Sequence, residues 1–99
     1  MFSSEVEQAL MAHPDVAEAA VMGYESTTWD EEVRAIVALR PGSPDVEPAA
    51  LADLCRTRLA GYKVPKRIAV VPLDDIPVNP SGKILKRLLR DSFRWDPSD

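Results

Sequence analysis

The stretch that decides the fold reads Arg34-Ala35-Ile36-Val37-Ala38-Leu39. It is followed directly by Arg40-Pro41-Gly42, in which the proline and the glycine are typical of a turn. A short apolar run that ends at turn residues predicts a β-strand. We therefore expect a strand over residues 34–39.

A second strand is expected just before this one. Residues 16–23 form a short apolar run bounded by turn residues, although residues 17–20 also have helical propensity. The polar stretch 25–32 would join the two runs as a long hairpin loop. The two strands would then be antiparallel.

The chain opens with a predicted helix. Ser4 and Glu7 have the spacing of a capping box, in which a hydroxyl and a carboxylate satisfy free amides at a helix start. Proline disfavours helical geometry in the residue before it, so the helix should end at His13-Pro14. One face of this helix would carry the apolar residues Val6, Ala9 and Leu10.

Three further elements are expected after the strand over residues 34–39. Pro48 suits the first turn of a helix and Gly61 suits its end, while residues 67–71 predict a third strand. Residues 72–82 contain three prolines and one glycine, which predicts a stiff loop before a last amphipathic helix. The apolar stripes of the two helices comprise Leu51, Leu54, Cys55 and Leu59, then Ile84, Leu85, Leu88 and Leu89.

The expected order is therefore α-β-β-α-β-α, in a single domain over residues 1–99. A strand reached through a helix lies parallel to a neighbour by a right-handed crossover. The fold class is α+β: a small, mixed, three-stranded sheet covered by helices.

Composition is ordinary for a globular domain, with 45% apolar and 28% charged residues in 99. The net charge of −4 hides an asymmetry: residues 1–53 sum to −9 and residues 54–99 to +5. Such a division can mark a surface that meets an anion, or simply two solvated faces. A lone cysteine, Cys55, and the lack of a signal peptide or an apolar run long enough for a membrane span favour the cytoplasm.

Lys83 is the residue best suited to a chemical role. It lies in residues 77–87, where the stiff loop is expected to enter the last helix. Its ammonium group would then be held at a fixed distance from the body of the domain, and the amides at the helix start would add positive potential. It is a candidate partner for a phosphate or a carboxylate. Ile84 stands where a nucleotide-binding P-loop needs Ser or Thr, which excludes that motif. From the residues alone, a solvated lysine beside a turn remains the alternative.

Three segments together resemble one protein family. Asn79-Pro80-Ser81-Gly82-Lys83-Ile84-Leu85-Lys86-Arg87 resembles the C-terminal signature of acyl-CoA synthetases, in the adenylate-forming superfamily. Residues 3–21, with Ser3-Ser4-Glu5-Val6-Glu7 and His13-Pro14-Asp15-Val16, and the turn Tyr62-Lys63-Val64-Pro65 resemble further family motifs in the same order. The resemblance spans nearly the whole chain.

The resemblance implies a lid domain that works with a large N-terminal domain, which lies outside this chain. The family converts a carboxylic acid and Mg-ATP to an acyl-adenylate, and then transfers the acyl group to the thiol of coenzyme A. ATP, Mg²⁺ and coenzyme A would be bound mainly by the large domain, and no metal site is expected here. Lys83 matches the lysine that enters the site for adenylation, and the same lysine is acylated in some relatives as a switch.

Other residues take supporting roles under the same resemblance. Pro80, Ser81 and Gly82 would position the loop that carries Lys83. Contacts with coenzyme A or with the large domain are expected from Lys63, Lys66, Lys86 and Arg87, although a solvated basic face remains the alternative for the last helix. The loop after the first strand reads Gly23-Tyr24-Glu25-Ser26 and departs from the family pattern, which weakens any prediction for it.

Two alternatives stay open. One is the lid of another adenylate-forming enzyme, of the peptide-synthetase or luciferase type, although Ile84-Leu85-Lys86 favours a coenzyme A ligase. The other is a stand-alone, non-catalytic module whose basic final helix contacts an acidic protein or nucleic acid. The negative net charge and the lack of stacking aromatic residues disfavour nucleic acid as a partner.

Overall fold

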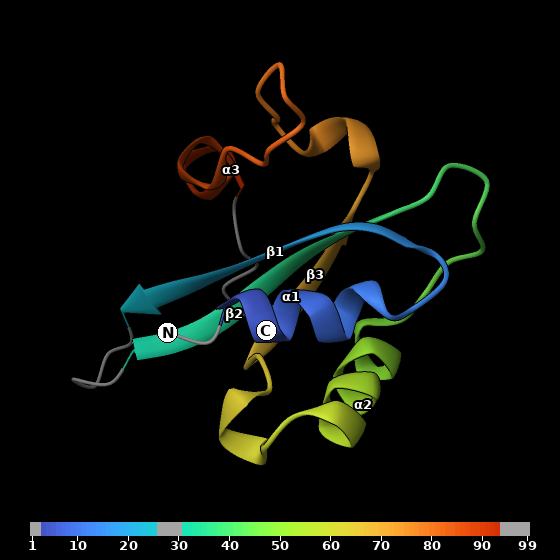
Figure 1. Cartoon of the computed structure of the whole chain (residues 1–99), viewed down its shortest axis with the longest axis vertical. Helices are drawn as coiled ribbons and strands as arrows, with labels where there is room; N and C mark the ends of the chain where they lie inside the picture. Colours follow the sequence, from blue (N-terminus) through green and yellow to red (C-terminus); the bar gives the residue numbers. More distant parts are fainter. Residues whose placement is uncertain (1–2, 26–30, 94–99) are drawn as a thin grey trace.

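The computed structural model describes residues 3–25 and 31–93 and confirms the predicted order of elements (Figure 1). Its longer elements are α1 (Ser3–Met11), β1 (Val16–Glu25), β2 (Glu31–Leu39), α2 (Pro48–Arg58), β3 (Arg67–Val71) and α3 (Lys86–Ser92). Two short 3₁₀ turns, η1 (Gly61–Lys63) and η2 (Leu73–Asp75), flank β3. The fold is α+β, as expected.

The sheet has the strand order β1-β2-β3, with β2 in the centre. Strand β1 runs antiparallel to β2, and Val21 lies opposite Ala35. Strand β3 runs parallel to β2, and Ala69 lies opposite Ile36. Strand β2 has a neighbouring strand on each side and a hydrophobic core on each face, and its residues 35–38 are 0% exposed.

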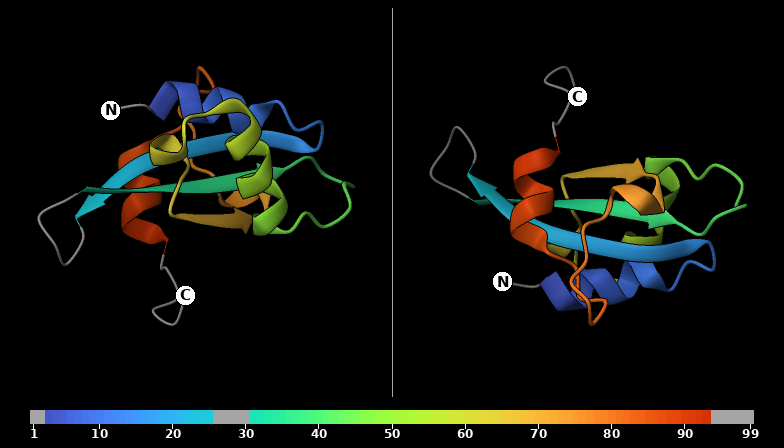
Figure 2. Two further views of the ribbon diagram at one scale, coloured as in Figure 1. Left: turned by 90° about the horizontal axis from the view of Figure 1, so that it is seen from below. Right: turned by 90° about the horizontal axis from the view of Figure 1, so that it is seen from above.

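Each face of the sheet has its own hydrophobic core. Ala35 and Val37 pack with residues of α1 and α2 on one face. Ile36 and Ala38 point to the other face, since side chains alternate along a strand, and there they pack with Leu89 of α3. Figure 2 shows the result: α1 and α2 cover one face, α3 covers the other, and the sheet is the middle layer.

Three local predictions need correction. Glu25, Glu31 and Glu32 belong to the strands, so the predicted hairpin loop is shorter; residues 26–30 lie outside the described part. The predicted capping box is not the arrangement found, because Ser4 lies within α1 and the Oε2 atom of Glu7 accepts a hydrogen bond from the Val21 amide. The last helix begins at Lys86, because Ile84 instead pairs with Val78 across an isolated β-bridge.

In the described ranges, 3–25 and 31–93, no helix is long and apolar enough to cross a bilayer.

Candidate functional site

Lys83 lies in a tight hairpin before α3. The amide of Asn79 donates to the carbonyl of Lys83 (2.9 Å), and the amide of Leu85 donates to the carbonyl of Pro77 (2.8 Å). These bonds flank the bridge between Val78 and Ile84 and close the hairpin. Lys83 therefore lies on a hairpin three residues before α3 begins at Lys86, and not at the helix start itself.

The side chain of Asn79 organises this turn from inside. Its Oδ1 atom accepts hydrogen bonds from the amide of Ser81 (3.1 Å), the hydroxyl of Ser81 (2.8 Å) and the amide of Lys83 (2.9 Å). Asparagine often holds a turn in this way, because its short side chain imitates a backbone carbonyl. Sequence reasoning missed this role for Asn79, although an Asn-Pro dipeptide three residues before a glycine is a turn signal.

Gly82 supplies the conformation that the turn needs. Its φ is +88°, in the left-handed region that glycine adopts without strain, and its amide donates to the carbonyl of Asn79 (2.8 Å). A Cβ atom at this position would meet nothing within 4 Å. Gly82 is thus needed for its backbone geometry, while Pro80 and Ser81 are exposed at the tip.

The ammonium group of Lys83 has no partner within the described part of the domain. The side chain is exposed, and among residues 3–25 and 31–93 none forms a hydrogen bond or an ion pair with its Nζ atom. Together with Glu7, Met11 and Lys86, Lys83 lines an open hollow of about 650 Å³ between α1 and the turn. A cation without a partner at the rim of a hollow is suited to binding an anion that arrives from outside.

Lys86, one of the predicted contact residues, has partners within the domain. Its Nζ atom lies 2.7 Å from Oε2 of Glu7 and donates to the carbonyl of Val21 (3.2 Å). The charge of Lys86 is therefore balanced within the domain. The contact between Glu7 and Lys86 was not predicted, because no local sequence pattern links α1 with α3.

The other predicted contact residues lie apart from this hollow or bind within the domain. Lys63, in η1, donates to Oε2 of Glu5 at 2.9 Å. Lys66 has an exposed side chain, while its backbone amide donates a hydrogen bond to the carbonyl of Val33 at 2.8 Å. Arg87 is exposed on α3. Lys83 and Lys86 are thus brought together, and Lys63 and Lys66 are not part of the same hollow.

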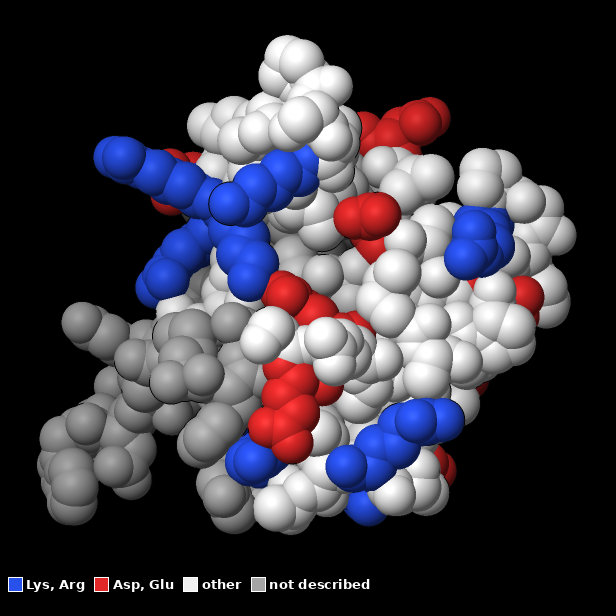
Figure 3. All heavy atoms as spheres, in the orientation of Figure 1, with Lys and Arg blue, Asp and Glu red and all other residues white. Residues whose placement is uncertain are grey.

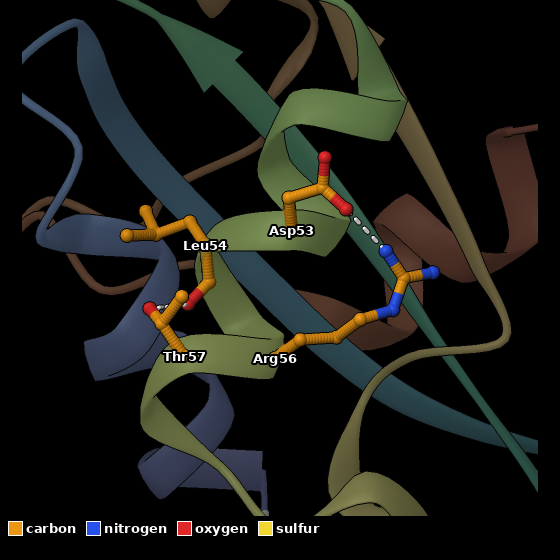
Figure 4. A network of polar contacts seen from close by, with 4 residues as sticks. All are labelled: Asp53, Leu54, Arg56 and Thr57. Atoms are coloured by element: carbon orange, nitrogen blue, oxygen red, sulfur yellow. Dashed lines mark hydrogen bonds and ion pairs between the residues drawn. The ribbon is translucent and has the colours of Figure 1, made fainter.

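The charges are distributed unevenly over the surface. In Figure 3, basic side chains gather around the position of α3, and acidic side chains adjoin them across the middle of the face. On α2, Asp53 pairs with Arg56, and the hydroxyl of Thr57 donates to the carbonyl of Leu54 at 2.7 Å (Figure 4). That network stays on the solvent-facing side of α2 and forms no part of the site.

The described residues hold neither a metal cluster nor a reactive thiol. Within residues 3–25 and 31–93, no group of three or more His, Cys, Asp or Glu side chains could hold a metal ion. Cys55 of α2 is buried in the core that also contains residues of α1 and the sheet, and this burial raises the pKa of its thiol, although the nearby Arg56 partly opposes the rise. A buried thiol of that kind is a structural residue.

Comparisons with known proteins agree on one family. The family model described as "AMP-binding enzyme C-terminal domain" matches residues 5–83. A 2-succinylbenzoate–CoA ligase of Geobacillus kaustophilus is 48% identical over 91 residues, which is 91% of this chain and 18% of the ligase. A fatty acid–[acyl-carrier-protein] ligase of Streptomyces coeruleorubidus is 42% identical over 96 residues, or 97% of this chain and 18% of that protein.

A solved structure agrees with these sequence matches. The fatty acyl CoA synthetase of Mycobacterium tuberculosis superimposes with a TM-score of 0.79 at 37% identity, covering 92% of this chain and 17% of that protein. The chain thus spans about a fifth or less of the length of these relatives. Because the family model and the relatives each match most of the chain, it belongs to the AMP-binding enzyme C-terminal domain family.

Proposed function

We propose that this chain is the lid of an AMP-forming acid–CoA ligase and that Lys83 is its catalytic residue. The observation that carries the proposal is the exposed, unpaired ammonium of Lys83 on a turn held by Asn79 and Gly82. A large N-terminal domain in the same protein would bind ATP, Mg²⁺, coenzyme A and most of the carboxylic acid. The free, buried Cys55 suits the reducing cytoplasm as the compartment.

The chemistry explains why a positioned cation is needed. A carboxylate oxygen attacks the α-phosphorus of ATP, a new P–O bond forms, and the bond to pyrophosphate breaks. Two anions approach each other in this step, and negative charge grows on the oxygens around phosphorus. The ammonium of Lys83, placed there when the lid closes, would stabilise that transition state more than the separate substrates.

The second half-reaction would not need Lys83. The thiol of coenzyme A gives up its proton to water and its sulfur attacks the acyl carbonyl; a thioester forms, and AMP leaves with the bonding electrons of the acyl–oxygen bond. The lid rotates between the two steps, as the family resemblance implies. Lys66 and Arg87, both exposed, would then be available for coenzyme A or the large domain.

A domain exchange tests the proposal. This chain would replace the matching region of the Geobacillus kaustophilus ligase and, separately, of the Streptomyces coeruleorubidus ligase. Acid-dependent ATP–pyrophosphate exchange reports the first half-reaction. We expect Lys83→Ala to lower exchange by about 10²–10³-fold, which is the usual cost of removing one such contact.

The matched control is Asp53→Asn, in the α2 network of Figure 4, which should leave exchange unchanged. Folded chimeras that exchange equally well with Lys83→Ala contradict the proposal. Folded wild-type chimeras that fail to exchange in both hosts also contradict it.

A carrier-protein thiol is a second candidate acceptor. The relative from Streptomyces coeruleorubidus is named as a ligase of fatty acids to acyl-carrier protein. Supplying each chimera with coenzyme A or with a carrier protein that bears a phosphopantetheine thiol separates the two. Faster thioester formation with the carrier protein in both hosts would assign that acceptor to this lid.

A further inference from the structure

Strand β1 is an edge strand, and two charged side chains cover its edge at one residue. Because β2 is its sheet neighbour, the groups of β1 that point away from β2 have no strand to pair with. At Val21, the amide donates to Oε2 of Glu7 at 2.8 Å, and the carbonyl accepts from Nζ of Lys86 at 3.2 Å. Glu7 and Lys86 also pair with each other at 2.7 Å.

This arrangement has a fixed polarity. Residue 7 must offer an acceptor and residue 86 must offer a donor, because the Val21 amide and carbonyl demand them. The two side chains are 22% and 40% exposed, so water screens the pair less than it screens most surface ion pairs. The contact therefore differs from a generic ion pair, in which the two charges could be exchanged.

The contact also lies at the base of the Lys83 turn. Lys86 is the first residue of α3 and lies three residues after Lys83. Between them, Ile84 packs against the core that contains Leu89, and the amide of Leu85 donates a hydrogen bond to the carbonyl of Pro77. The base of the turn is thus held on one side by core packing and on the other by the edge of β1.

We propose that Glu7 and Lys86 are positioning residues that hold the Lys83 turn against the edge of β1. Through this contact, α1 and β1 determine where the Lys83 ammonium sits relative to the rest of the lid. The role in catalysis rests on the proposed function, whereas the mechanical role does not. Pre-organised support of this kind keeps a reactive group within the narrow geometry that catalysis requires.

The mechanical role is tested on the 99-residue chain alone by NMR amide hydrogen exchange. We expect Glu7→Ala and Lys86→Met to speed exchange at the amides of Val21, Lys83 and Leu85 by about tenfold or more, as for loss of a charged hydrogen bond. Lys86→Arg keeps a charged donor and should stay close to wild type. Glu7→Gln keeps an acceptor without the charge and should fall between.

The matched control is Glu5→Gln, two residues away on α1. It removes a carboxylate that pairs with Lys63 of η1 instead of the Lys83 segment, so the Lys83 and Leu85 amides should not change. Lys86→Met with wild-type exchange at Lys83 and Leu85, whatever happens at Val21, overturns the proposal.

The catalytic consequence is tested in the chimeras described above. Lys86→Met should lower kcat of ATP–pyrophosphate exchange by about tenfold and leave KM for ATP and acid unchanged, because a loose turn reduces transition-state contact without removing substrate binding. Lys86→Arg should restore kcat. The exchanged pair Glu7→Lys with Lys86→Glu should not, because the Val21 groups would then face the wrong partners.

The outcomes separate this inference from the proposed function. If Lys83→Ala is harmless but Lys86→Met loosens the turn, the proposed function fails and the mechanical role stands. If Lys83→Ala abolishes exchange but Lys86→Met changes neither turn nor kcat, the positioning role fails alone. A rise in KM for coenzyme A with an unchanged turn would make Lys86 a ligand contact and would also overturn the proposal.

Discussion

Replacing Asn79 with alanine tests how the Lys83 turn is built. The Asn79 side chain accepts three hydrogen bonds, from the Ser81 amide, the Ser81 hydroxyl and the Lys83 amide. Each neutral hydrogen bond contributes about 0.5–1.5 kcal/mol, and these exposed ones belong at the low end because water competes for them. The turn should therefore lose about 1–2 kcal/mol, which lowers its closed population relative to open forms by about 5–30-fold.

This loss should remain local. The turn projects from the domain and lies outside both cores, so the free energy of unfolding measured in urea should fall by less than about 1 kcal/mol. Amide exchange at Lys83 should rise about 5–30-fold, in step with the opening equilibrium. In the chimeras, ATP–pyrophosphate exchange should fall by about tenfold, less than with Lys83→Ala, because the ammonium is still present.

Asn79→Asp is the matched variant for this test. It keeps an acceptor oxygen at the same place, so the turn should stay closed. The reasoning is refuted if Asn79→Ala leaves Lys83 amide exchange at the wild-type rate, or if Asn79→Asp opens the turn as much as alanine does.

Three further predictions concern the rest of the chain. Gly82→Ala should destabilise the turn by about 1–2 kcal/mol, because φ is +88° there, and it should speed Lys83 amide exchange; wild-type exchange would contradict the backbone argument. Leu51→Ala should lower the urea-derived free energy of unfolding by about 2–5 kcal/mol, because Leu51 is 0% exposed; a loss below 1 kcal/mol would show that the core collapses around the gap. The thiol of Cys55 should react with iodoacetamide far more slowly in the folded chain than in urea at pH 8, because burial raises its pKa and blocks access; equal rates would refute its burial.

Much of the fold follows from local pattern. The strand predicted over residues 67–71 is found with the same bounds, and the helix expected from Pro48 begins there. Short apolar runs that end at proline and glycine leave few other conformations open to the chain. The start of α3 was missed because the pairing of Ile84 with Val78 outweighs the apolar periodicity, which alone favours a helix at that residue.

The candidate site divides in a similar way. Lys83 and its Asn-Pro-Ser-Gly turn are visible in the sequence, because all the residues that shape the turn lie within a few positions of one another. Gly82 has a φ of +88°, a backbone role that sequence reasoning did not predict, while its expected role in positioning the loop that carries Lys83 stays a prediction. The roles of Lys63 and Lys86 in binding partners outside the chain stay predictions, with both side chains engaged by carboxylates of α1.

The sequence by itself determined the order of elements and the short loop, bearing prolines and a glycine, that carries Lys83. These features depend on residues that are close together along the chain, so the sequence pattern alone contains the information that sets them. Only the tertiary structure decided that Glu7 does not cap the start of its own helix, as its spacing from Ser4 had predicted. Its carboxylate instead accepts a hydrogen bond from the Val21 amide and pairs with Lys86. Such a contact depends on which strand lies at the edge of the sheet and leaves its amides unpaired, and that is a property of the assembled layers.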